Sequence, residues 1–203
     1  MKSVYIDLND INAYASYVNS IGGNIRLEVG EQDSLTYIAA ETSFMRGDND
    51  GARRSLINYL QTFPEGAFSS NANFYLGSIA FAKKEFDEAI QRFKSVIASG
   101  DTKFLEESVA RTAEIEYLSK DYPAALESFK RLQIVAENPE NRQAARLGIM
   151  RCALQTGQQK DALLAADELL KEPKLSPELE AEARYVRAKA YIAQNRRTRR
   201  LPT

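Results

Sequence analysis

The chain has 203 residues, of which 44% are hydrophobic, and its 27 basic and 28 acidic side chains leave a net charge of −1. This length and composition allow a sizeable core, in one domain or in one elongated array of repeats. The balanced charge gives no general attraction to nucleic acid or to an anionic membrane. The single Cys excludes an internal disulfide framework and a zinc site built from several Cys.

Residues 1–32 form an N-terminal segment. Apolar residues recur every three or four positions from Ile11 to Ile21, which predicts a helix over residues 9–21 that two glycines end. Residues 25–29 then alternate apolar and polar side chains, a pattern typical of a short extended segment. Two interpretations fit: the segment is the remnant of a preceding repeat, or it is a dedicated N-terminal cap.

Residues 33–176 contain four similar segments, each with two amphipathic helical patterns joined by a tight turn. A small residue one turn into each second helix recurs at separations of 37, 36 and 37 residues, at Ala52, Ala89, Ala125 and Ala162. The partner position twelve residues earlier, in each first helix, holds Ala40, Gly77, Ala113 and Met150. Each hairpin keeps apolar surface on both flanks, so it needs a similar neighbour to bury it. We therefore divide the region into four repeats, residues 33–69, 70–105, 106–142 and 143–176.

The apolar periodicity of the repeats predicts eight helices, near residues 34–46, 49–62, 67–83, 86–98, 103–119, 122–135, 139–155 and 158–171. Residues 47–51, which lie between the first two, are rich in glycine and aspartate. They lack the alternating carboxylates and the closing Glu of a calcium-binding EF-hand loop, so we interpret them as a turn between helices.

A last helix is predicted over residues 177–195. Tyr185, Ala188 and Ile192 share one face of it, and we expect that face to cover the last hairpin, which makes the helix a C-terminal cap. A truncated fifth repeat is the alternative. A basic tail follows over residues 196–203, interpreted either as a solvated tail or as an arm for nucleic acid or anionic lipid; it contains Arg196, Arg197, Arg199 and Arg200.

Charge is distributed unevenly along the chain. Residues 1–66 carry five basic and nine acidic side chains, a balance of −4, whereas residues 177–203 carry seven basic and three acidic ones, a balance of +4. Self-association through these opposite ends of the chain is therefore one alternative to consider.

The pattern resembles the tetratricopeptide repeat (TPR) family. The matching residues of residues 70–103 are Leu76, Gly77, Phe81, Phe86, Ala89 and Phe93. The resemblance implies an all-α, right-handed superhelical solenoid of about four TPR-like helix hairpins with helical caps. The period exceeds the family's usual 34 residues, and the fourth repeat departs from the pattern with Met150 at a small-residue position and Ala166 at an aromatic one.

A narrower likeness concerns the junction from Phe63 to Phe68, which reads FPEGAF. Such junctions are similar to those of bacterial envelope arrays, among them the lipoproteins of outer-membrane assembly and the Tol–Pal coordinators. That likeness favours the periplasm or cell envelope over the cytoplasm, although no signal peptide or membrane-spanning run is present in the sequence.

Catalysis is not expected. The chain has no His, which removes the commonest general base and most zinc sites. Cys152 lies within a first helix, where a buried, unreactive role is expected. The adjacent Glu106 and Glu107 fit a solvated helix face better than a pair of catalytic carboxylates. We predict no enzyme activity, no cofactor, no metal site and no small-molecule substrate.

Binding is the expected function, because the first helices of such hairpins line a concave face. The family's clamp for a C-terminal carboxylate needs a Lys and an Asn one turn apart on a first helix, and no matching position here has that pair. We expect a peptide or partner protein to be bound by Tyr37, Phe74, Tyr75, Arg111, Glu114 and Arg151. For Tyr37 and Phe74, packing between repeats is the alternative. The rival functions are a structural segment of a larger envelope complex and, less favoured by the charge, nucleic-acid binding.

Overall fold

The computed structural model describes residues 2–8, 10–21, 28–100 and 102–198, and every regular element in these ranges is an α-helix. The chain divides into two compact units, residues 1–104 and 105–203. The predicted extended segment falls largely on residues 22–27, which lie outside the described residues, as do Arg199 and Arg200 of the basic tail. None of the described helices combines the length and the apolar character that crossing a membrane requires.

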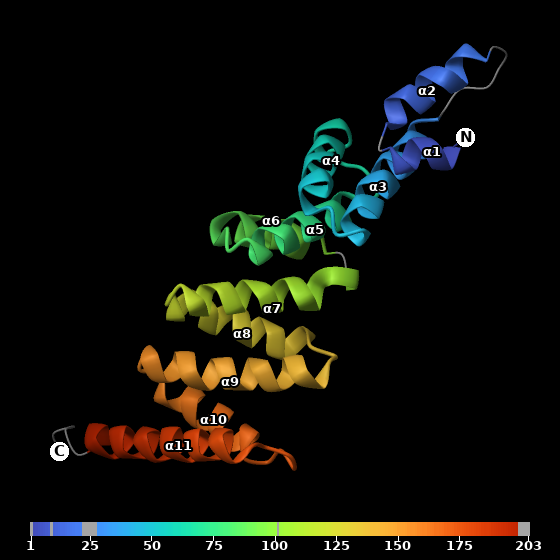
Figure 1. Ribbon diagram of the computed structural model, residues 1–203. Helices are drawn as coiled ribbons and strands as arrows, with labels where there is room; N and C mark the ends of the chain where they lie inside the picture. Colours follow the sequence, from blue (N-terminus) through green and yellow to red (C-terminus); the bar gives the residue numbers. More distant parts are fainter. Residues whose placement is uncertain (1, 9, 22–27, 101, 199–203) are drawn as a thin grey trace. The chain divides into compact units, whose positions relative to one another are not determined.

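Among the described residues, six helices lie within the first unit, and the last four of them pair as two hairpins (Figure 1). They are α1 (Lys2–Asp7), α2 (Ile11–Ser20), α3 (Val29–Met45), α4 (Asn49–Thr62), α5 (Ser69–Ala82) and α6 (Phe86–Ser99). Helix α3 packs along α4 and α5 along α6, while α4 also contacts α5, so the two hairpins stack on each other. Helices α1 and α2 both contact α3 and cover it from the N-terminal side.

The second unit continues the same alternation of first and second helices (Figure 1). Its helices are α7 (Thr102–Leu118), whose first three residues belong to the first unit, α8 (Tyr122–Val135), α9 (Pro139–Gln155), α10 (Gln159–Leu169) and α11 (Pro177–Thr198). Helix α9 packs against α8 on one side and α10 on the other, and α11 packs on α10. This arrangement leaves α7 and α9 as neighbouring first helices.

All four hairpin turns have the same backbone conformation. The second residue after the first helix is left-handed in each, at Gly47 (φ 80°), Lys84 (φ 60°), Lys120 (φ 62°) and Gly157 (φ 73°). Its N–H donates to the carbonyl three residues earlier, and the next N–H donates to the carbonyl five residues earlier. These are the hydrogen bonds of a Schellman turn, which ends a helix and reverses the chain.

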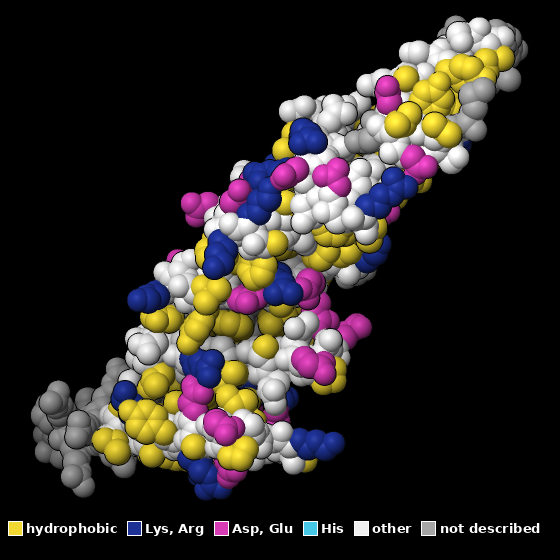
Figure 2. Space-filling view, in the orientation of Figure 1, with side chains coloured by type: hydrophobic (Ala, Val, Ile, Leu, Met, Phe, Trp, Pro, Cys, Tyr) yellow, Lys and Arg dark blue, Asp and Glu magenta, His cyan; other side chains and the backbone are white. Residues whose placement is uncertain are grey.

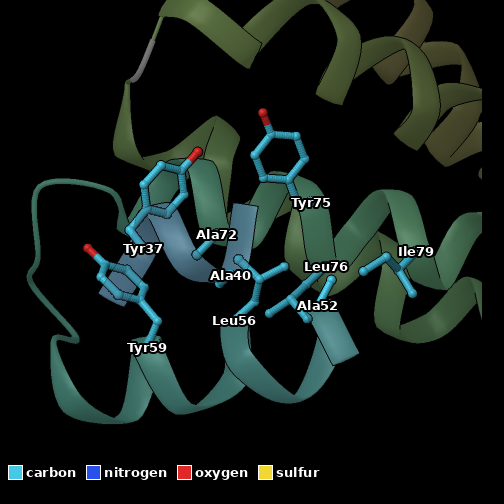
Figure 3. Close-up of a cluster of buried hydrophobic side chains, with 9 residues drawn as sticks. All are labelled: Tyr37, Ala40, Ala52, Leu56, Tyr59, Ala72, Tyr75, Leu76 and Ile79. Atoms are coloured by element: carbon cyan, nitrogen blue, oxygen red, sulfur yellow. The ribbon is translucent and has the colours of Figure 1, made fainter. Parts of the chain in front are cut away.

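The core of the first unit lies where α3, α4 and α5 meet (Figure 3). Tyr59 of α4 is fully buried there, and its hydroxyl donates to Asp33 (2.6 Å) while accepting from the N–H of Phe68 (3.0 Å). The other oxygen of Asp33 accepts from the N–H of Ala67 (2.9 Å). The buried Tyr59–Asp33 pair therefore holds the FPEGAF junction in place through hydrogen bonds to its backbone. Position 66 must be glycine, since a Cβ there would lie 2.4 Å from the Tyr59 hydroxyl.

Three expectations about the helices need correction. The short helix α1 was not expected, and α3 begins at Val29, five residues before the expected start. The predicted inner face of the last helix is wrong. Ala183, Val186 and Ala190 form the buried face of α11, whereas Tyr185, Ala188 and Ile192 are exposed.

Candidate functional site

A groove of about 380 Å³ lies on the second unit, along the first helices α7 and α9. Helix α8 lies beneath it and supplies its floor. Its lining comprises Glu107, Ala110, Arg111, Glu114, Tyr117 and Leu118 of α7, Phe129 and Leu132 of α8, and Asn141, Ala144, Leu147, Gly148 and Arg151 of α9. The volume is within the range of ordinary ligand pockets, and the position is that of the expected concave face.

The floor of the groove is apolar because the helices approach closely at a glycine. A Cβ added to Gly148 would lie 2.4 Å from ring atoms of Phe129, so only glycine lets this ring fit below α9. Leu132 is fully buried beside it, and Leu147 and Ala110 are partly exposed at the sides. A bulky apolar side chain placed here would be removed from water on several sides.

The α7 rim is a small charge network on one helix. Arg111 donates from Nε to Glu107 (2.8 Å), one turn earlier, and from Nη1 to Glu114 (3.0 Å), about one turn later. All three side chains are about half exposed, so these pairs contribute little to stability. Their polar atoms stay within reach of a ligand, and the rim carries one more negative than positive charge.

The α9 rim is held by a two-point ion pair. Arg151 donates from Nε and Nη2 to the two carboxylate oxygens of Glu182 on α11, both at 2.7 Å. The hydrogen bond to Glu182 raises the pKa of Arg151, and the same bond holds the pKa of Glu182 below its usual value. Because two nitrogens on one edge of the guanidinium are bound to Glu182, Arg151 presents a fixed orientation to the groove.

Glu106 positions the opposite end of the groove. Its carboxylate accepts from the N–H groups of Glu137 (2.9 Å) and Asn138 (3.1 Å), and from the side chain of Asn141 (2.7 Å). Burial raises the pKa of Glu106, but these three hydrogen bonds outweigh it, so the pKa lies below its usual value. The bonds join α7 to the start of α9 and orient the Asn141 amide at the groove.

Three of the six predicted binding residues therefore meet in one place: Arg111, Glu114 and Arg151. The other three lie in the first unit. Tyr37 is 2% exposed, stacks on Phe68 with ring centroids 4.4 Å apart, and donates to Glu41 (2.6 Å), so its side chain belongs to the packing between helices.

Tyr75 and Phe74 also contribute to packing in that unit. Tyr75 is 7% exposed, and its hydroxyl donates to Glu41 (3.0 Å). Burial raises the pKa of Tyr75 and that of Tyr37. Phe74 is partly buried and stacks on Phe104, with ring centroids 4.2 Å apart. A direct role of these two residues in binding stays a prediction.

Sequence reasoning missed several groove residues. Asn141 and Glu106 are in contact only because the two first helices α7 and α9 lie side by side. Glu182, which binds Arg151, is 31 residues later in the sequence, on α11. The repeat alignment did contain a signal for Ala110 and Leu147, which occupy equivalent first-helix positions 37 residues apart. No group of three or more His, Cys, Asp or Glu side chains able to hold a metal ion occurs among the described residues.

Comparisons with known proteins agree with the repeat architecture. Residues 44–102 match the family model described as tetratricopeptide repeat. Two crystal structures of MamA are similar: one has 16% identity, a TM-score of 0.58, and covers 82% of this chain and 90% of its own. The other has 16% identity, a TM-score of 0.53, and covers 86% of this chain and 99% of its own.

A chain described as a kinesin light chain of Podosopora anserina with nearly identical TPR-like repeats is also similar. It has 14% identity and a TM-score of 0.50, and the alignment covers 94% of this chain and 92% of that one. No curated protein sequence matches the chain. At these identities the likeness concerns the fold, and it confirms the predicted all-α fold of TPR-like hairpins. The narrower likeness to envelope arrays stays a prediction.

Proposed function

We propose that this chain, with its TPR-like hairpins, is a non-enzymatic adaptor that binds a peptide segment of a partner protein in the groove along α7 and α9. One observation carries the proposal: an apolar floor around Phe129 and Gly148 is bordered by oriented polar groups of Arg111 and Arg151. Grooves that combine an apolar floor with a few fixed polar groups are typical of ligand sites.

In this mode of binding, the apolar floor and the polar rim of the groove contact different parts of the peptide. A bulky apolar side chain of the partner enters the floor, and burying it contributes about 1.5–3 kcal/mol. The peptide backbone then meets the Asn141 amide and the Arg151 guanidinium, which Glu106 and Glu182 already hold in place. Such preorganisation lowers the entropic cost of binding. No covalent step is involved.

The test is a peptide selection with a blocked groove as the comparison. Peptides are selected from a random display library on the unmodified protein, and their affinities are measured by fluorescence anisotropy. Ala144 is exposed at the groove, so Ala144→Tyr fills it without disturbing the core. Ala98→Tyr on α6, also exposed, is the matched control.

We expect selected peptides to share a bulky apolar residue and to bind Ala144→Tyr at least about tenfold more weakly, a change of roughly 1.4 kcal/mol. Binding to Ala98→Tyr stays as in the unmodified protein. Equal binding to both variants, or selected peptides without an apolar residue in common, contradicts the proposal.

A structural segment of a larger assembly, including an envelope assembly, is a second candidate. The observation that favours it is a pair of exposed apolar side chains on α11, Tyr185 (61% exposed) and Ile192 (54% exposed). Localisation by fractionation of the source cells tests the envelope form of this candidate, and recovery in the cytosolic fraction alone contradicts it.

A further inference from the structure

Glu41 of α3 is a carboxylate that the chain orients without pairing it with a cation. Its Oε1 accepts hydrogen bonds from the hydroxyls of Tyr37 (2.6 Å) and Tyr75 (3.0 Å). Asn71 in turn donates to the Tyr37 hydroxyl (3.2 Å), so groups of both α3 and α5 fix this oxygen. We call these four side chains the Glu41 cluster. In Figure 3 the hydroxyls of Tyr37 and Tyr75 point to the same side of the two helices.

The charge of Glu41 has no counter-charge. Among the described residues no Lys or Arg forms an ion pair with it, and its second oxygen, Oε2, accepts no hydrogen bond from them and is reached by solvent. Other carboxylates of the first unit are paired, such as Glu85 with Arg53 (2.6 Å). Figure 2 likewise shows basic and acidic side chains next to each other in several places on the face in view.

The surroundings of Tyr75 agree with an unneutralised carboxylate. Burial, and then the hydrogen bond to Glu41, raise the pKa of Tyr75, and no positive charge of the described residues acts on its hydroxyl. A partly buried charge without a partner costs free energy, and a bound cation offsets that cost. The Glu41 cluster is therefore suited to a positively charged group.

The repeat alignment places Glu41 at a position that lines the groove in the second unit. It is the residue directly after the small-residue position of its first helix, and Glu114 and Arg151 hold the same place in the third and fourth repeats. Glu114 and Arg151 both line the groove along α7 and α9. Glu41, which is partly exposed, thus occupies the binding position of its own hairpin.

The aromatic side chains around Glu41 limit what can bind there. Four residues before it, Tyr37 is buried and stacked, whereas the equivalent residue of the third repeat is the small Ala110, which leaves the groove open. A bulky apolar side chain therefore finds no space beside Glu41. Phe44, one turn later on α3, is partly exposed and contacts the ring of Tyr75 with centroids 4.6 Å apart. Aromatic rings next to a carboxylate attract cations.

We propose that the Glu41 cluster binds a basic side chain of a partner protein, with arginine as the best fit. Oε2 of Glu41 accepts from the guanidinium, whose plane packs against the neighbouring ring of Phe44. Tyr37 and Tyr75 are positioning residues, which hold Oε1 and so fix the direction of Oε2. The site belongs to the first unit and does not depend on the proposed peptide groove along α7 and α9.

The test is an NMR titration with two probes that differ in charge. Acetyl-arginine methylamide is one probe, and its citrulline counterpart replaces the guanidinium by a neutral urea group of nearly the same shape. The amide signals of residues 37–45 and 71–76 are followed in the isotope-labelled protein. Glu41→Gln removes the charge but keeps an oxygen that can accept from both tyrosines. Glu65→Gln, at an exposed carboxylate outside the cluster, is the matched control.

We expect the arginine probe to shift these signals in a saturable manner. The citrulline probe should bind at least about tenfold more weakly, because it cannot form a charge-assisted hydrogen bond. Glu41→Gln should weaken binding of the arginine probe by a similar factor and remove the difference between the two probes. Glu65→Gln should bind both probes as the unmodified protein does.

The proposal fails when the arginine probe leaves these signals unshifted, or when the citrulline probe binds as tightly. It also fails when Glu41→Gln binds the arginine probe as tightly as Glu65→Gln does. The comparison of the two probes needs only the unmodified protein, so it decides the question even where the substitution disturbs folding.

Discussion

The ring of Phe93 occupies the space that a side chain at position 77 would need: a Cβ built on Gly77 lies 2.8 Å from Cε1 of Phe93. The two residues are 16 positions apart, on the first and second helix of one hairpin. In the fourth hairpin the same two positions hold Met150 and Ala166, and both are fully buried. The fourth repeat therefore differs from the family pattern by a volume exchange between these two positions: the large side chain is on the first helix (Met150) and the small one on the second (Ala166).

This exchange predicts a compensating pair. Met150→Gly should lower the free energy of unfolding by about 2–5 kcal/mol through the cavity it leaves. Ala166→Phe alone should also destabilise, by about 1–3 kcal/mol, through overpacking. The double variant restores the arrangement of Gly77 and Phe93, so it should be more stable than either single variant in urea unfolding. Additive losses in the double variant contradict the volume exchange.

A second prediction concerns the junction between α4 and α5. Tyr59→Phe removes the donor to Asp33 and the acceptor of the Phe68 N–H, and should lower the free energy of unfolding by about 1–3 kcal/mol. Tyr191→Phe, at a tyrosine that is 49% exposed, is the control and should change it little. Equal effects of the two substitutions in urea unfolding would mean that the buried network contributes nothing.

A third prediction is a pH dependence at the α9 rim. Arg151 lowers the pKa of Glu182 below the ordinary value of 4.5. A lowered folded-state pKa gives stability that is present above the unfolded value and is lost as pH falls through the folded value. Glu182→Gln should therefore cost about 0.5–1 kcal/mol at pH 7 and almost nothing well below pH 4, because the pair is partly exposed to solvent.

The control for this pH dependence is the same substitution in an Arg151→Gln background, where the cost at pH 7 should disappear. A cost of Glu182→Gln that is the same at both pH values, or that persists without Arg151, is inconsistent with the ion pair as its source.

A fourth prediction concerns Cys152. The thiol is fully buried, and burial raises its pKa to about 11. At pH 8 it should react with a thiol reagent only as fast as the protein unfolds. A Ser95→Cys variant supplies an exposed thiol for comparison, which should react at once. Rapid reaction of Cys152 in the folded protein would show that α9 opens locally.

The sequence was most informative where helix ends have local signals. Helices α4, α8 and α9 begin and end as predicted, and the side chains of Asp48, Asp121 and Asn138 cap their first turns. Helix α3 has no side-chain cap, and it begins at Val29, which the alternating pattern assigned to an extended segment. Periodicity without a cap left this boundary open.

The sequence was least informative where contacts depend on the placement of whole helices. The repeat pattern assigned Arg111, Glu114 and Arg151 to first helices, and they lie on α7 and α9. The carboxylates that orient the groove, Glu106 and Glu182, carry no local pattern that reveals their partners. Helix α11 has apolar residues on two faces. The larger side chains, Tyr185 and Ile192, led to the wrong prediction of its inner face, because the buried face is formed by the smaller side chains of Ala183, Val186 and Ala190.

The four identical hairpin turns have a consequence for engineering this chain. Glycine adopts the left-handed conformation without cost, whereas Lys84 and Lys120 keep it at a cost of about 1 kcal/mol each. Replacing both with Gly should raise the melting temperature and leave the helices on either side unchanged. Such a background would tolerate library mutagenesis of the groove, in which many otherwise useful substitutions are lost because they unfold the protein.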